Sequence, residues 1–171
     1  ALVAGIIAGG VWSLLAGWFD LKFRLNLLVS TLLLNYIAIY VCSYFVSFPL
    51  KDTSGSAAIN QTNMIDRAVW LPKLFKGMSV HAGFVLAALA AVLLFLVLRH
   101  TVAGYHLRMH GSNPLFALYG GVRRGRLMAW TMLASGGFAG LAGAVEVLGT
   151  QYRYIDNALT APGYAWSGIM A

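Results

Sequence analysis

The sequence predicts an all-α, polytopic transmembrane helical bundle, and three observations lead to that prediction. Hydrophobic residues make up 60% of the 171-residue chain and charged residues only 10%, whereas about a quarter of an ordinary soluble domain is charged. Four apolar runs approach the length of about 20 residues that crosses a bilayer. The formal charge of +7 lies in the gaps between these runs and forms no basic-aromatic stripe, so we expect no nucleic-acid partner.

Polar segments separate the expected spans. The first span contains Gly5 and Gly9, whose spacing lets two membrane helices approach closely. A polar turn after it contains Asp20 and Lys22, and Pro49 closes the second span. The spans are expected at residues 1–19, 27–48, 82–98 and 127–148, and the start of a further one at 163–171.

The distribution of lysine and arginine predicts the orientation of the spans. Connections 20–26 and 99–126 are two crossings apart and therefore share a side, and 99–126 has no acidic residue. Because basic residues are retained on the cytoplasmic side, we expect 99–126 to be a cytoplasmic loop and 49–81 an extracytoplasmic one. The latter is expected to carry a short amphipathic piece at the bilayer interface, formed by Trp70, Leu71, Leu74 and Phe75.

The stretch "HGSNPLFALYGG", residues 110–121, predicts a short helix inside the cytoplasmic loop. Asn113 can cap free backbone N–H groups, and Pro114 suits the first helical position. Gly120 and Gly121 offer the left-handed conformation that ends a helix. The apolar side chains between them would either tuck under the lipid headgroups or fill a socket on a partner, and spacing alone leaves both interpretations open.

Four motifs in order resemble bacterial ABC importer permeases of the simple sugar and nucleoside type, which are related to ribose and branched-chain amino acid permeases. The motifs are "RHTVAGY" at 99–105 with "GSNP" at 111–114 and "ALYGGV" at 117–122, "NLLVSTLLLNYIA" at 26–38, "SGGFAGLAGAVEVLG" at 135–149 and "PGYAWSGIMA" at 162–171. The resemblance implies that residues 1–171 are a single permease domain, the central fragment of a longer chain in the bacterial inner membrane. Leu27 and Leu115 stand where the family usually has acidic residues.

The same resemblance implies that the short helix is a coupling helix, which docks in a cleft of a separate ATPase subunit. The residues assigned to this coupling are Gly111, Asn113, Pro114, Leu115, Phe116, Ala117, Tyr119 and Gly121. The implied partners are ABC ATPase subunits, a second permease subunit, an extracytoplasmic substrate-binding protein and the lipid bilayer. No cofactor is implied.

Polar residues inside the expected spans are candidates for a substrate pathway: Ser30, Asn35, Tyr36 and Glu146. A charge at the bilayer centre costs about 2.5–3.5 kcal/mol, so Glu146 either lines or braces the pathway or lies solvated at the outer end of its span. Helical spacing puts it on the face of Ala139, Ala142 and Gly143, which we expect to pack tightly against other helices.

Ser30, Thr31 and Asn35 are expected near one face of the second span. There they would hydrogen-bond across helices or present donors and acceptors to a sugar or nucleoside.

No pattern in the chain predicts catalysis. His106 and His110 have a metal-compatible spacing, but no Cys or carboxylate in residues 99–126 completes a site. Cys42 lies in an apolar run, where simple packing is expected. With no nucleophile-base pair and no phosphate loop, we expect a transport subunit rather than an enzyme. The alternatives are an ion-coupled secondary carrier that uses Glu146 and a purely structural membrane subunit.

Overall fold

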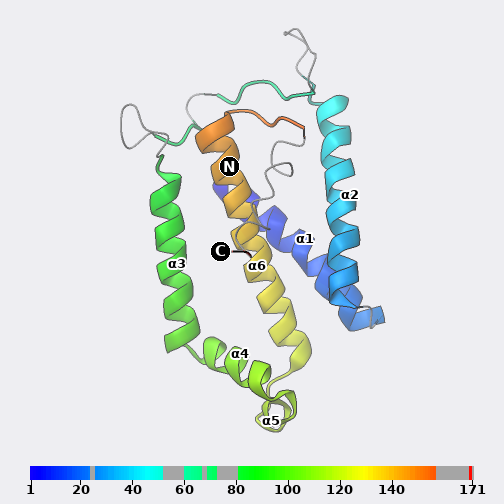
Figure 1. Ribbon diagram of the computed structural model, residues 1–171, viewed down its shortest axis with the longest axis vertical. Coiled ribbons are helices and arrows are strands. Elements are labelled where there is room, and N and C mark those ends of the chain that lie inside the picture. The colour runs from blue at the N-terminus through cyan, green and yellow to red at the C-terminus, as the bar shows by residue number, and fades with distance from the viewer. Residues whose placement is uncertain (24–25, 52–59, 67–68, 73–80, 157–169, 171) are drawn as a thin grey trace.

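Six α-helices form most of the computed structural model (Figure 1), which describes all residues except 24–25, 52–59, 67–68, 73–80, 157–169 and 171. The helices are α1 (Leu2–Phe23), α2 (Leu27–Ser47), α3 (Gly83–His100), α4 (Val102–Ser112), α5 (Pro114–Tyr119) and α6 (Arg124–Glu146), and a π-helical turn, η2 (Val147–Gln151), extends α6. The all-helical prediction is confirmed, because strand pairing within the described ranges is limited to two isolated bridges.

Four of these helices are long and apolar enough to cross a membrane: α1, α2, α3 and α6 with η2. They confirm the four predicted spans, but the boundaries differ. Asp20 and Lys22 continue α1 instead of forming a turn, because no glycine or proline interrupts the helix there. The further span predicted at 163–171 lies outside the described residues except for Met170.

α1 and α6 run antiparallel and touch through their backbones. A Cβ atom built on Gly9 would overlap the carbonyl oxygen of Gly136, and one on Gly5 would lie 3.0 Å from the carbonyl oxygen of Gly140. Glycine is therefore the residue that permits this approach, as small residues do between membrane helices. The close approach predicted from Gly5 and Gly9 is confirmed, and its partner is α6.

Small residues recur at every fourth position on both helices. They are Gly5, Gly9, Ser13 and Gly17 on α1 and Gly136, Gly140 and Ala144 on α6. Ser13 Oγ also donates a hydrogen bond to Met132 Sδ at 3.7 Å. At the α5 end of the pair, Arg124 Nη2 lies 3.8 Å from Asp20 Oδ2. An ion pair with an exposed arginine adds little stability, so the small-residue seam is what joins α1 to α6.

α2 and α3 flank the α1–α6 pair on opposite sides (Figure 1) and leave much of their apolar surface exposed. α3 meets α6 near its own beginning, where Gly83 lies against Val145. Helices that are apolar on nearly every face are typical of membrane spans. The exposed faces of α2 and α3 are therefore suited to lipid or to further spans.

Connections at the end opposite α5 are tied together by hydrogen bonds. The backbone N–H of Thr62 donates to the carbonyl oxygen of Tyr154 at 3.0 Å, and Tyr154 N–H donates back to Thr62 Oγ1 at 3.0 Å. Trp70 stacks on Tyr152, with ring centroids 4.2 Å apart. Of the predicted amphipathic piece, Trp70 and Leu71 are not in an α-helix, while Leu74 and Phe75 lie outside the described residues. The described part of loop 49–81 is thus packed against the chain that follows α6.

Candidate functional site

The short helix α5 begins as the sequence predicts. Asn113 Oδ1 accepts hydrogen bonds from the backbone N–H groups of Leu115 and Phe116, both at 3.1 Å. Pro114 occupies the first turn, where its missing donor leaves nothing unsatisfied. A six-residue helix is marginal in water on its own, so this cap is a substantial part of what keeps α5 formed.

The end of α5 differs from the prediction. Gly120 has φ −73° and its N–H donates to the carbonyl oxygen of Phe116, so it continues the helical hydrogen bonding. Gly121 alone of the two is left-handed, with φ 81°. The prediction of a left-handed conformation was therefore right for Gly121 and wrong for Gly120, since one left-handed residue is enough to end a helix.

α5 presents an apolar surface. Ala117 is fully buried and Val122 is nearly so, and together they seat the helix. The remaining side chains point outward, and their exposed fractions are 69% for Leu115, 62% for Phe116, 63% for Leu118 and 89% for Tyr119. Figure 1 places α5 at the tip of the molecule, beyond α4. A contiguous exposed apolar patch of this kind marks an interaction surface.

α4 carries α5 and was missed by the sequence analysis, which treated residues 99–112 as loop. Thr101 is its N-cap, and Thr101 Oγ1 accepts from Gly104 N–H at 3.3 Å. A Cβ on Gly104 would overlap the backbone of Leu98, so glycine is required where α3 turns sharply into α4. Thr101 followed by Gly104 is a recognisable cap, and that signal was available in the sequence.

Glu146 is the last residue of α6. This helix has 23 residues, which makes it about 35 Å long at 1.5 Å per residue, against a hydrocarbon core of about 30 Å. η2 extends this span to Gln151, so Glu146 lies near one end of the span and not at its centre, and it is half-buried there. Whether it lines the pathway or only ends the span stays a prediction.

The prediction that the face of Glu146 packs tightly was wrong. Ala139 and Ala142 are exposed, and a Cβ on Gly143 would meet nothing within 4 Å among the described residues. The face that packs against α1 instead contains Gly136 and Gly140. The fourth span contains two stripes of small residues, and helical spacing alone could not tell which of them meets a partner.

The other pathway candidates are not gathered into one site. Ser30 is buried, and its Oγ has no hydrogen-bond partner in the described ranges. Thr31 Oγ1 donates to its own helix, to the carbonyl oxygen of Leu28. Asn35 and Tyr36 are exposed on a different side of α2, so the expectation that Ser30 shares a face with Asn35 was wrong.

A polar cluster joins the far end of α2 to the segment after η2. Ser43 Oγ donates to Asp156 Oδ2 at 2.9 Å. Burial raises the pKa of the Tyr154 phenol, and the nearby Cys42 and Asp156 raise it further. The phenol therefore stays neutral at physiological pH. Cys42, for which plain packing was expected, has Tyr154 as a neighbour.

The described residues also include side chains of the kinds that bind metal ions. None of their His, Cys, Asp and Glu side chains form a group of three or more that could hold a metal ion. The candidate functional site consists of the capped apolar helix α5, the helix α4 that precedes it, and the four spans.

Comparison with known proteins identifies the family. A family model described as "Branched-chain amino acid transport system / permease component" matches residues 1–171. The chain belongs to this permease family. As a member with four candidate spans, it is a multi-pass protein of the cell membrane.

Three relatives of this permease are informative. The guanosine ABC transporter permease protein NupP of Bacillus subtilis is 32% identical over 96% of the chain and 47% of the relative. The glucose ABC transporter permease protein TsgB13 of Haloferax volcanii is 30% identical over 98% and 46%, and the nucleoside ABC transporter permease protein NupB of Lactococcus lactis is 20% identical over 91% and 44%. The permease chain thus spans about half the length of these relatives. No solved structure matches it significantly.

Removal of the α5 cap should loosen the helix without unfolding the permease. In Asn113→Ala, the N–H groups of Leu115 and Phe116 lose their acceptor, which costs about 1 kcal/mol. We expect about fivefold faster hydrogen exchange of the α5 amides, measured by mass spectrometry. Asn113→Asp keeps the acceptor and is the matched control; equal exchange in wild type and Asn113→Ala would show that the cap contributes nothing.

Proposed function

We propose that the chain is part of the permease subunit of an ABC importer and that it carries a nucleoside or a simple sugar across the membrane. The observation that carries the proposal is the capped helix α5, which holds four large apolar side chains outward at the tip of the molecule. ATP would be hydrolysed by a separate subunit, which α5 contacts. A second permease subunit and an extracytoplasmic binding protein complete the proposed assembly.

In this proposal residues 99–126 face the cytoplasm and residues 49–81 face outward. The charge distribution supports the assignment, because the described arginines of α4, α6 and the turn between them lie at the α5 end. α5 then lies where an ATPase would meet it. Closure of the paired ATPases on ATP would push α5 and α4 together as one rigid body. The buried side chains of Ala117 and Val122 hold α5 in place for this movement. The spans attached to this body would follow.

The substrate class rests on the named relatives. Two relatives of nearly equal identity, 32% and 30%, carry the names of a guanosine permease and a glucose permease. Their names support a neutral, hydroxyl-rich cargo of nucleoside or sugar type. Asn35 and Tyr36 are proposed as groups that contact such a cargo, because both are exposed on α2 and offer hydrogen bonds and an aromatic face.

Uptake by the full-length permease tests this function directly. The permease would be reconstituted in proteoliposomes with the ATPase and binding protein encoded beside it, and labelled guanosine, glucose and leucine would be supplied separately. We expect ATP-dependent accumulation of a nucleoside or a sugar. Accumulation of a branched-chain amino acid, with neither of the other two carried, would refute the substrate class and leave the importer mechanism standing.

Replacement of Glu146 separates the importer from an ion-coupled carrier. Because Glu146 ends α6 and lies half-buried near the end of the span, we expect Glu146→Gln to keep ATP-driven uptake within about threefold of wild type, since a charge near the end of a span is less critical than one at mid-membrane. Proton or sodium gradients without ATP should drive no uptake in either protein. Gradient-driven uptake that Glu146→Gln abolishes would establish the carrier instead.

A further inference from the structure

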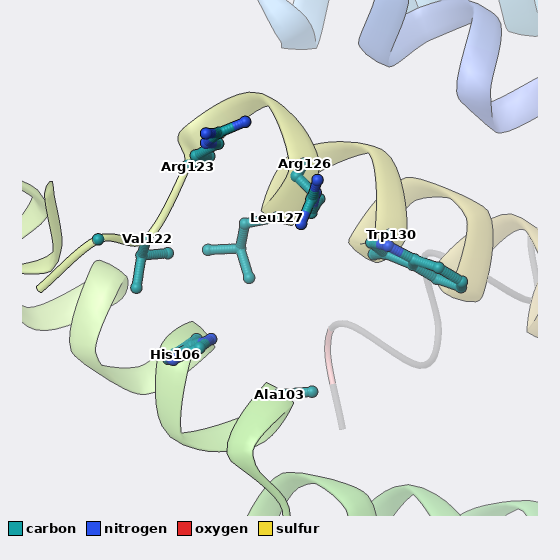
Figure 2. Close-up of a pocket in the computed structure, with 8 residues that line it drawn as sticks. Ala103, His106, Val122, Arg123, Arg126, Leu127 and Trp130 are labelled. Atoms are coloured by element: carbon teal, nitrogen blue, oxygen red, sulfur yellow. The ribbon is translucent and has the colours of Figure 1, made fainter.

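A basic cleft opens beside α4 at the α5 end of the spans. Its volume is about 400 Å³, and its walls come from two elements, with Ala103 and His106 on α4 and Arg126, Leu127 and Trp130 on α6. Arg123, in the turn before α6, lines it as well, together with Gly121 and Val122. Figure 2 shows the α4 side chains facing those of α6 across the space, with Leu127 and His106 directed toward each other.

The cationic side chains of this cleft have no carboxylate partner in the described chain. Of the five acidic residues, Asp20 lies next to Arg124, which does not line the cleft. Three others, Asp66, Glu146 and Asp156, belong to the opposite end of the spans, and Asp52 is outside the described residues. Arg123 and Arg126 are both exposed. The cleft thus offers uncompensated positive charge to an anion.

The surroundings of the cleft are those of a membrane boundary. Trp130, which is 67% exposed, lies near the start of a membrane-spanning helix, where tryptophan side chains typically sit at headgroup level. A second, apolar hollow of about 550 Å³ is lined by α3 from Leu89 to His100 and by Thr101. It reaches the α3–α4 corner, two residues before Ala103. Hydrocarbon surface and positive charge therefore meet at one corner of the fold.

We propose that this cleft binds the phosphate group of an anionic phospholipid, with its acyl chains against the apolar side of α3. The recognised chemistry is a phosphate anion, which arginine guanidinium groups bind through paired N–H donors. Because the cleft lies at the end of the spans, at the level expected for lipid headgroups, we take the anion to be a headgroup phosphate. Basic pockets between spans on the cytoplasmic side are suited to such headgroups, and each nearby arginine strengthens the attraction roughly fivefold.

Lipid retention by the full-length permease tests the proposal. The protein would be purified from nanodiscs containing equal amounts of phosphatidylglycerol and phosphatidylcholine, and native mass spectrometry would count the lipids that remain bound. We expect wild type to retain phosphatidylglycerol in preference to phosphatidylcholine. In the double variant Arg123→Gln, Arg126→Gln, the ratio of bound phosphatidylglycerol to bound phosphatidylcholine should fall roughly twentyfold. Arg108→Gln, an exposed arginine of α4 outside the cleft, should behave as wild type.

Two further arms make the result unambiguous. Arg123→Lys, Arg126→Lys keeps both charges and should keep most of the preference, which separates lost charge from lost folding. The proposal is overturned if wild type shows no preference, or if the two glutamine substitutions leave it unchanged. Displacement of phosphatidylglycerol by millimolar inorganic phosphate would also overturn it, because the cleft would then be a site for the free anion.

Discussion

Phe116→Asp should abolish uptake by the assembled importer while leaving the membrane part folded. Phe116 is 62% exposed at the tip of the molecule, so a charge there costs the isolated permease little. In the assembly the same carboxylate would enter an apolar socket without a partner. Loss of a central aromatic contact costs about 2–4 kcal/mol, which predicts at least a roughly 30-fold loss of ATPase binding. Uptake in proteoliposomes and co-purification of the ATPase measure the two effects.

Ser112→Asp is the matched control for Phe116→Asp. It places the same charge on an exposed side chain four residues earlier, at the end of α4 and outside the apolar patch of α5. We expect this variant to bind the ATPase and to transport nearly as wild type does. Wild-type uptake in Phe116→Asp would show that α5 does not couple to an ATPase.

Gly9→Ala should strongly destabilise the permease, because one methyl group meets backbone that cannot move aside. The new Cβ would overlap the carbonyl oxygen of Gly136 and lie 2.9 Å from Gly140 Cα. Relief requires separation of α1 from α6 along their seam, and overpacking of this kind costs about 1–3 kcal/mol or more. The expected result is a lower midpoint of thermal unfolding in detergent, monitored by tryptophan fluorescence, together with a lower yield of monodisperse protein.

Gly143→Ala tests whether the effect belongs to the seam and not to any glycine of a span. Gly143 is also in α6, but a Cβ there meets nothing within 4 Å in the described chain. Alanine should be tolerated at this position and could even raise the unfolding midpoint, since it favours a helix more than glycine does. Equal loss of stability in both variants would contradict close packing at Gly9.

The four spans, the pairing of Gly5 and Gly9 with another helix, and the capped start of α5 were predictable from the sequence. Each depends on a local signal: apolar length, the spacing of small residues, or the order of Asn113 and Pro114. The family followed from motifs, and the match over residues 1–171 confirms it. The sequence was enough to predict a feature wherever the residues of one segment determine that segment's conformation.

The remaining features depend on contacts between distant segments. Gly136 and Gly143 have similar neighbours in sequence, yet only Gly136 meets α1, and no periodicity distinguishes them. Ser30 is buried and Asn35 exposed on α2, a helix that packs against α1. The apolar residues of α2 are spread over all its faces, so hydrophobicity could not predict which face is covered. The stacking of Trp70 on Tyr152 joins segments that are separated by two spans, so it too could not be predicted from the sequence.

The seam between α1 and α6 also limits how these two helices can move. Glycine backbones interlock at intervals of four residues, so sliding by less than one interval, about 6 Å of helix, would drive a carbonyl oxygen of one helix into the other. Small axial shifts are therefore opposed, and α1 and α6 are expected to move together. In the proposed importer, a push applied at α5 would then displace both helices.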